Sequence, residues 1–196
     1  KNGEIPKDLE YPAFTKAVNS FGKEWKDIVF IINNEEELKE AYTKIKSEEI
    51  IIQQYIEKVD EQGCEGFSVN HGKDVFLSVW NREAYHLPSQ YAPVWINSNV
   101  TDEKFIKKAS AMIEDIGFEG IFEFEFMVGK DGELYFLEIN FRNTVNGWET
   151  TMAGMPGVTL WCKSMIDNKI DRSCYREIPE GFYTMAECFD YDVRVK

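Results

Sequence analysis

Histidine is scarce in this chain, where His71 and His86 are the only two among 196 residues. Histidine is the usual base of nucleophilic catalysis and a common zinc ligand, so this composition leaves little for either chemistry. The cysteines form no C-x-x-C pair and are Cys64, Cys162, Cys174 and Cys188. This scatter favours reduced thiols over disulfides or a zinc site, and it favours a cytoplasmic location.

Positive charge is also in short supply. Lysine and arginine total 22 against 35 aspartate and glutamate residues, which gives a net charge of −13. Without a basic run, we expect neither nucleic acid nor an anionic membrane as a partner. No apolar run approaches the roughly 20 residues of a membrane-spanning helix, and no signal peptide is visible. The first residue is Lys1 rather than methionine, which suggests a piece of a longer protein.

Apolar residues are plentiful, with 43% hydrophobic and 14% aromatic side chains. This content can fill a sizeable core and predicts one domain or two small lobes. Asn34 followed by Glu37 resembles a capping box and predicts the start of a helix. A second helix is predicted from Asp102 to about Ile116, with Gly117 as its end.

The stretch from residue 120 to residue 142 predicts an antiparallel hairpin. Two runs of period-2 alternation flank an Asp131-Gly132 turn signal. A two-residue turn there places Lys130 opposite Glu133. Counting outward gives the pairs Glu125 with Glu138, Glu123 with Asn140, Phe126 with Leu137, Phe124 with Ile139, and Phe122 with Phe141. One face of the hairpin is therefore acidic, and the other is an apolar surface for a core.

Two opposed glutamates are unfavourable unless they are solvated or share a cation. Asn140 adds a neutral oxygen beside Glu125 and Glu138, and Arg142 extends the same face. Hard divalent ions that act on nucleotides take a few such oxygens and complete their shell with phosphate oxygens. The alternative is a solvated edge hairpin with an ordinary acidic exterior.

Glu125, the D-G turn and the run Leu-Glu-Ile-Asn-Phe-Arg ending at Arg142 together resemble the metal-binding hairpin of the ATP-grasp superfamily. The resemblance implies that Glu125, Glu138 and Asn140 hold magnesium, or manganese in its place, across the phosphates of ATP. It implies that Arg142 faces the phosphoryl group or the acyl phosphate. Glu123 has no fixed counterpart. The implied fold is α+β, with two lobes whose antiparallel sheets sandwich the nucleotide.

The resemblance extends upstream to the phosphate-binding elements. Lys16, in a predicted strand from residue 13 to residue 18, resembles the lysine that reaches the nucleotide phosphates. Residues 19–26 resemble the loop that closes over them, although this loop is usually glycine-rich and has only Gly22 here. Lys23 or Lys26 is therefore expected to supply more of the charge. For Lys16 alone, a solvent-facing lysine is the ordinary alternative.

The adenine and ribose contacts are assigned in the same way. The resemblance implies that the backbone of Gln54 and Ile56 reads the adenine edge, and that Gln53 contacts the adenine amine. Glu65 matches the carboxylate that holds the ribose, with Glu57 and Asp60 as rivals. For these residues the ordinary alternative is a polar loop between lobes.

Arg82 follows a predicted strand where family members place a basic residue near phosphate or acyl substrate. A plain surface arginine is an equal alternative.

The expected organisation is a small lobe over residues 1–55, a large lobe with the metal hairpin over 56–167, and an extension of unclear role over 168–196. The resemblance implies a preceding domain of the same protein that contributes substrate contacts, and we expect it to lie outside this sequence. The expected function is an ATP-dependent ligase that converts a small-molecule carboxylate into an acyl phosphate and joins it to an amine, as amino-acid or peptide ligases do. The alternatives are a nucleotide-binding module without turnover and an acidic domain that binds calcium regardless of adenine nucleotides.

Overall fold

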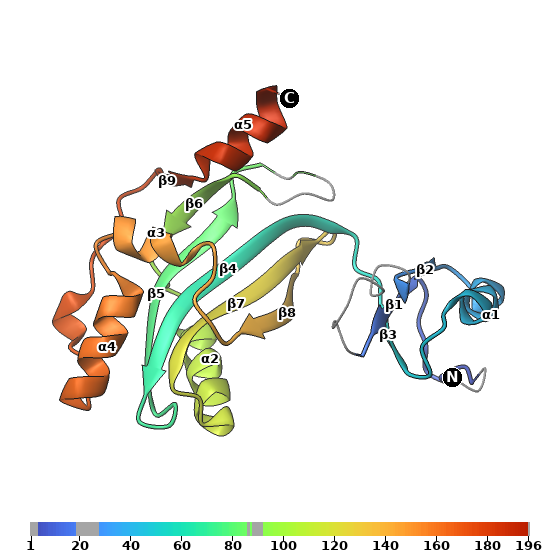
Figure 1. Cartoon of the computed structure of the whole chain (residues 1–196), viewed down its shortest axis with the longest axis horizontal. Helices are drawn as coiled ribbons and strands as arrows, with labels where there is room; N and C mark the ends of the chain where they lie inside the picture. The colour runs from blue at the N-terminus through green and yellow to red at the C-terminus, as the bar shows by residue number, and fades with distance from the viewer. Residues whose placement is uncertain (1–3, 19–27, 86, 88–91, 196) are drawn as a thin grey trace. The chain divides into compact units, whose positions relative to one another are not determined.

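The structure, a computed structural model, describes residues 4–18, 28–85, 87 and 92–195. The chain divides into two units, Lys1–Glu57 and Lys58–Lys196. Each unit has its own antiparallel sheet (Figure 1). Each unit also has its own apolar core. The predicted α+β class with antiparallel sheets is therefore confirmed.

The described part of the first unit contains a three-stranded sheet and the α-helix α1. Its sheet has the order β2-β1-β3, and its elements are β1 (Ala13–Ala17), β2 (Ile31–Ile32), α1 (Glu35–Lys44) and β3 (Ile50–Gln54). The predicted capping box is present, because Asn34 Oδ1 accepts a hydrogen bond from the Glu37 amide at 2.9 Å. Leu38 and Ala41 of α1 pack with Ile32 and Ile45 to form the core.

The second unit is a six-stranded antiparallel sheet with the order β8-β7-β4-β5-β6-β9. In chain order its elements are β4 (Lys58–Val69), β5 (Asp74–Glu83), β6 (Val94–Ser98), α2 (Glu103–Ile116), β7 (Gly120–Gly129), β8 (Leu134–Asn140), α3 (Gly147–Met152), α4 (Gly157–Asp167), the short 3-10 helix η2 (Arg172–Cys174), β9 (Phe182–Met185) and α5 (Glu187–Val195).

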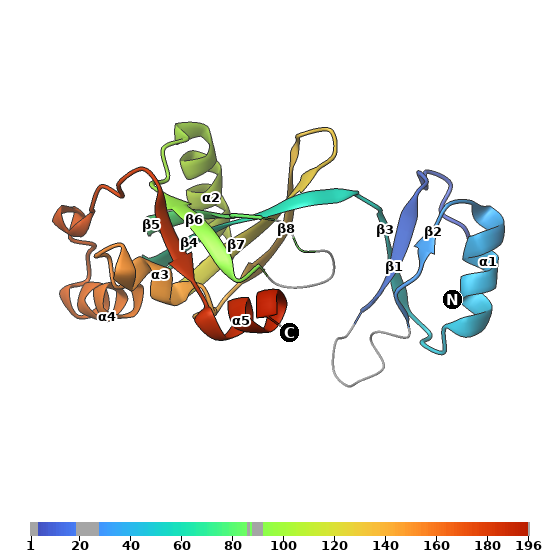
Figure 2. The same cartoon turned by 90° about the horizontal axis from the view of Figure 1, so that it is seen from above.

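Helices cover both faces of this sheet, with α2 on one side and α3 and α4 on the other (Figure 2). Alternation along β7 divides its side chains between the two faces. Phe122, Phe124 and Phe126 join the core beneath α2, whereas Ile121 packs into the core that includes Leu160 of α4. Strand geometry then places Glu123 and Glu125 on the same face as Ile121. The acidic face of the predicted hairpin therefore lies on the side of α3 and α4.

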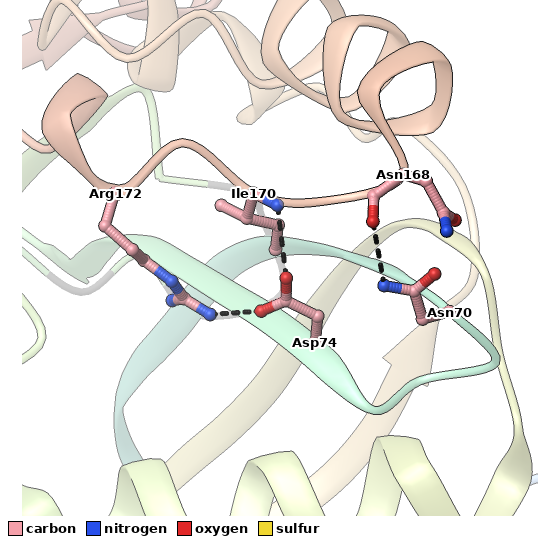
Figure 3. Close-up of polar contacts among 5 residues, drawn as sticks. All are labelled: Asn70, Asp74, Asn168, Ile170 and Arg172. Carbon is pink, nitrogen blue, oxygen red and sulfur yellow. Dashed lines mark hydrogen bonds and ion pairs between the residues drawn. The ribbon is translucent and has the colours of Figure 1, made fainter.

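The segment after α4 is held against the turn between β4 and β5 (Figure 3). Asp74 accepts a hydrogen bond from the Ile170 amide at 3.1 Å and forms an ion pair with Arg172. Asn70 donates its side-chain amide to the Asn168 carbonyl at 3.4 Å. After these contacts the chain returns to the sheet, where β9 pairs with β6. Residues of the predicted extension 168–196 thus complete the sheet of the second unit.

The predicted hairpin is present, and the pairs that matter for its acidic face are confirmed. Glu125 lies opposite Glu138, and Glu123 lies opposite Asn140. The predicted two-residue turn is wrong. The Gly129 amide bonds to the Glu133 carbonyl, so a three-residue loop with Gly132 at φ +82° connects the strands.

The three-residue loop shifts the adjoining pairs by one position. Phe126 therefore lies opposite Phe136 rather than the predicted Leu137. A bulge after Glu125 absorbs the shift and restores the predicted register for Phe124 with Ile139 and for the glutamate pair. The predicted pair of Phe122 with Phe141 does not form, because β8 ends at Asn140.

Candidate functional site

The candidate site is a set of acidic and amide side chains on one face of the second sheet, beside α3. Three elements supply its open part. Strand β7 contributes Glu125, β8 contributes Glu138 and Asn140, and the loop after β8 contributes Arg142. Asn140 Nδ2 donates to Oε1 of Glu125, and Arg142 donates to Asn140 Oδ1 at 3.1 Å. The structure thus brings together all four residues that the sequence placed on this hairpin.

A second group of carboxylates lies deeper on the same face, where Glu65, Glu123 and Glu149 are at most 3% exposed. Glu65 and Glu123 face each other across β4 and β7. Their hydrogen bonds come from neutral donors: Thr144 Oγ1 to Glu65 at 2.7 Å, Asn146 Nδ2 to Glu123 at 3.4 Å and Asn140 Nδ2 to Glu123 at 3.3 Å. These bonds fold the loop after β8 back over the carboxylates.

Glu149 projects from α3 into a chain of neutral polar groups. Its two oxygens accept from Asn81 Nδ2 at 3.1 Å and from Thr184 Oγ1 at 2.6 Å. Thr184 in turn accepts from Asn97 Nδ2 at 2.8 Å. This chain ties α3 to strands β5, β6 and β9, so the C-terminal strand supports the candidate site.

Burial raises the pKa values of the carboxyl groups on this face, and the charges of neighbouring glutamates add to the rise. Loss of solvation raises the pKa of Glu125 to about 7, and the charges of Glu123 and Glu138 add to this rise. Burial likewise raises the pKa of Glu149 to about 7. Burial raises the pKa of Glu65 well above its usual range, and the charge of Glu123 adds to the rise. A bound cation would stabilise the charged carboxylates and lower their pKa values again, so the face is suited to positively charged ligands.

The donor set at the hairpin fits a magnesium ion that also contacts phosphate. Glu125, Glu138 and Asn140 offer carboxylate and amide oxygens, which hard divalent cations prefer. Across the described part of the chain, no group of three or more His, Cys, Asp or Glu side chains is arranged to hold a metal ion. The set therefore provides too few protein ligands for a closed cage, and phosphate or water oxygens would have to complete it.

Two residues predicted from the sequence lie away from the open part of this site. Glu65 is 1% exposed and accepts a hydrogen bond from Thr144, so the loop after β8 covers its side chain. Its contact with a ribose stays a prediction. Arg82 neighbours Asn81 in β5, and alternation directs it to the opposite face, where Trp80 packs beneath α2. Of the rivals to Glu65, Glu57 is exposed in the first unit, and Asp60 accepts from Gln62 at 3.3 Å.

The predicted nucleotide residues of the first unit lie on two faces of its sheet. Lys16 pairs with Ile51, and Phe14 pairs with Gln53, so Lys16 and Gln53 share the face away from α1. Both side chains are exposed. Gln54 pairs with Ala13 and points to the other face, which does not affect the backbone role predicted for it and Ile56. Lys23 and Lys26 lie outside the described residues.

Sequence reasoning missed Glu149, Asn81 and Thr184. Each belongs to a different element, and no spacing in the sequence links them. A polar residue inside an otherwise apolar strand was the one available signal, as at Asn81 after Val-Trp. In the structure Cys64, Cys162, Cys174 and Cys188 are free thiols.

No family model matches the sequence, and no curated protein matches it either. Solved structures do match. The chain is similar to the biotin carboxylase domain of 2-oxoglutarate carboxylase from Hydrogenobacter thermophilus, in complex with MgADP, ADP and bicarbonate (TM-score 0.63, 23% identity, 93% of this chain and 42% of that chain).

It is also similar to N5-carboxyaminoimidazole synthetase from Staphylococcus aureus (TM-score 0.61, 21% identity, 81% of this chain and 42% of that chain). A third match is L-amino acid ligase from Bacillus licheniformis (TM-score 0.56, 21% identity, 82% of this chain and 40% of that chain). All three are ATP-grasp proteins. The chain has the ATP-grasp fold.

The ATP-grasp fold is the one that the hairpin motif predicted from the sequence. The chain spans about two fifths of the length of these ATP-grasp structures. Within the described residues, no helix combines the length and the apolar character needed to cross a membrane.

Proposed function

We propose that the chain is part of an ATP-dependent ligase that uses MgATP to convert a small-molecule carboxylate into an acyl phosphate, which an amine then captures. The observation that carries the proposal is the pairing of Glu125 with Glu138 beside Asn140 on the hairpin of an ATP-grasp fold. Among the similar structures, the biotin carboxylase domain was solved with MgADP. An amino-acid or peptide ligase is the proposed type, in line with the similarity to L-amino acid ligase.

The roles follow from charge and position. Glu125, Glu138 and Asn140 would hold magnesium, which neutralises phosphate charge when it is bound. Arg142, anchored on Asn140, offers a guanidinium to the transferred phosphoryl group or to the acyl phosphate. In the first unit, Lys16 would bind phosphate and Gln53 the adenine amine. The backbone of Gln54 and Ile56 would read the adenine edge.

This chemistry does not depend on a histidine base. Phosphoryl transfer is accelerated mainly by positioning the reactants and neutralising the developing charge. A chain with two histidines can therefore support the proposed reaction. A small-molecule carboxylate and an amine are the proposed substrates, and a further domain of the same protein is proposed to complete their binding.

A second candidate function is a nucleotide-binding module with little or no turnover. The placement of Arg82 favours it, because of the two arginines predicted to act in catalysis only Arg142 lies beside the carboxylates. Loss of one phosphate-facing cation would leave nucleotide binding in place while slowing transfer.

The experiment compares Glu138→Ala with the matched variant Glu133→Ala, both exposed on the same hairpin. MgATP binding is measured by calorimetry, and ADP release is measured against a panel of carboxylates and amines. The proposal expects at least about a tenfold loss of MgATP affinity in Glu138→Ala only, because a carboxylate ligand to the metal is lost. Equal affinity in both variants would refute the metal role. Binding without ADP release for any substrate pair would support the second candidate.

A further inference from the structure

The acidic face continues into a pocket of the second unit with a volume of about 240 Å³. Gly63 of β4 lines the pocket, and its polar lining residues are Glu61, Gln62, Asn81, Glu123, Glu125 and Asn146. Trp95, Phe126 and Leu137 supply apolar surface. The hairpin bulge contributes here, because Leu137 is the residue of β8 that has no partner in the β7 ladder. The pocket shares Glu125 with the open oxygen set at Glu138 and differs from it in having apolar walls.

Asn81 adds a buried amide group to the carboxylates of the pocket. Its side chain is 0% exposed, and its Oδ1 atom has no hydrogen-bond partner. Its amide nitrogen donates to Glu149, which directs Oδ1 away from that carboxylate. A Cβ built on Gly63 would lie 2.6 Å from Asn81 Oδ1 and 3.4 Å from Glu123 Oε1. Both oxygens therefore border the space over Gly63.

An unpaired buried acceptor costs free energy that a ligand with hydrogen-bond donors would recover. The same pocket is lined by three carboxylates, those of Glu61, Glu123 and Glu125, and a carboxylate is an acceptor. A phosphate or carboxylate would face repulsion here, and a hydroxyl could satisfy one oxygen only. A protonated amine carries three donors and a positive charge, so it can satisfy Asn81 and Glu123 together.

The walls favour an organic cation over a hydrated metal ion. Trp95 offers an aromatic surface that attracts cations, and Leu137 can pack against alkyl carbons. A volume of about 240 Å³ lies below the usual 300–1,000 Å³ of pockets for drug-sized ligands. The occupant is consequently a small molecule.

We propose that this pocket binds the protonated nitrogen of a small amine substrate through Asn81 Oδ1 and the Glu123 carboxylate. The inference rests on the proposed ligase function for its biological meaning, since it names where the amine would bind. It does not require magnesium or ATP for the binding itself. Glu123, which has no fixed counterpart in the ATP-grasp motif, thereby receives a specific role as an amine-recognition residue.

The test titrates the full chain with n-propylammonium chloride and with 1-propanol, its neutral isostere, and follows backbone amide signals by NMR. The titration is run in EDTA and repeated with magnesium. The proposal expects saturable shifts around Gly63 and Asn81 with propylammonium and none with propanol. Glu123→Gln should weaken propylammonium binding at least about tenfold, the effect of losing one charge-assisted hydrogen bond.

Two further variants test whether the propylammonium affinity depends on the pocket itself or only on the overall negative charge. Gly63→Ala places a methyl group against Asn81 Oδ1 and should also weaken propylammonium binding without changing any charge. Glu133→Gln removes one exposed negative charge elsewhere on the hairpin and should leave the affinity unchanged. Equal binding of propanol, or unchanged propylammonium affinity in both Glu123→Gln and Gly63→Ala, would overturn the proposal.

MgATP binding, measured in parallel, distinguishes this inference from the proposed function. If propylammonium binds as expected and MgATP does not bind, the amine pocket stands and the ligase proposal fails. If MgATP binds and propylammonium does not, the amine pocket fails and the ligase proposal stands. Glu138→Ala should lose MgATP affinity but keep propylammonium affinity, because Glu138 does not line the pocket.

Discussion

Replacing Glu149 by glutamine tests whether a buried carboxyl group makes the stability of this protein depend on pH. Glu149 is 0% exposed, and the groups that donate to it, Asn81 and Thr184, are neutral. A charged carboxylate in this setting loses solvation without gaining a cation. Glutamine has nearly the same shape and keeps an acceptor for one of the two donors, and Thr184 can rotate its hydroxyl to accept from the new amide.

The magnitude follows from the pKa of Glu149, which burial raises from its ordinary 4.5 to about 7. At about 1.36 kcal/mol per pKa unit, this difference corresponds to about 3 kcal/mol. Because the pKa is raised in the folded state, the stabilisation is complete below pH 4.5. It is lost as the pH rises from there through about 7. The wild type should therefore lose about 2 to 3 kcal/mol more than Glu149→Gln between pH 5 and pH 8.

The assay is urea-induced unfolding of both proteins at pH 5 and pH 8, with Glu133→Gln as the control. The control should change the free energy of unfolding by less than about 0.5 kcal/mol at either pH, because Glu133 is exposed. If the wild type and Glu149→Gln show the same change between pH 5 and pH 8, Glu149 is not titrating in the folded protein as argued. The account of the buried acidic face would then be wrong.

Two other predictions concern metal binding at the hairpin and the stability of the fold. Binding of Mn²⁺ alone, followed by electron paramagnetic resonance, should weaken by up to about tenfold per pH unit below pH 7, since the ion must displace a proton from Glu125. The Glu125→Gln variant should bind Mn²⁺ weakly, and its Mn²⁺ affinity should not depend on pH in this range. A pH dependence that remained in this variant would contradict the role of Glu125 as the titrating ligand. Gly72→Ala should lower the free energy of unfolding by about 3 kcal/mol, because a Cβ at φ +77° would lie 2.3 Å from the Ile113 carbonyl oxygen. Gly132→Ala, at φ +82° in open space, should cost only about 1 kcal/mol, and urea-induced unfolding measures both glycine variants.

The hairpin could be predicted because its signals are local. Alternation with period 2 and a D-G turn specify which side chains share a face, and Glu125 and Glu138 are only thirteen residues apart. The loop length could not be predicted, since Asp-Gly suits both a two-residue and a three-residue turn. The register of the glutamate pair agreed with the prediction because the bulge after Glu125 compensates for the extra loop residue.

The candidate site was predicted less completely than the hairpin. The face of Arg82 depends on the register of β5 within a six-stranded sheet, and a sequence motif does not specify it. The burial of Glu65 depends on the loop after β8, where Thr144 lies 79 positions away in the chain. The family pattern placed both residues by their order along the chain, which carries no information on the direction of a side chain.

By itself the sequence determined the acidic and apolar faces of the hairpin, the two capped helices and the oxygen set of Glu125, Glu138 and Asn140. These follow from periodicity and from interactions within about twenty residues. Only the tertiary structure decided which carboxylates are buried together. Glu65, Glu123 and Glu149 come from β4, β7 and α3, and their proximity results from strand order and helix packing. Burial raises their pKa values because removal from water disfavours charge, and the exclusion of water is a property of the assembled fold.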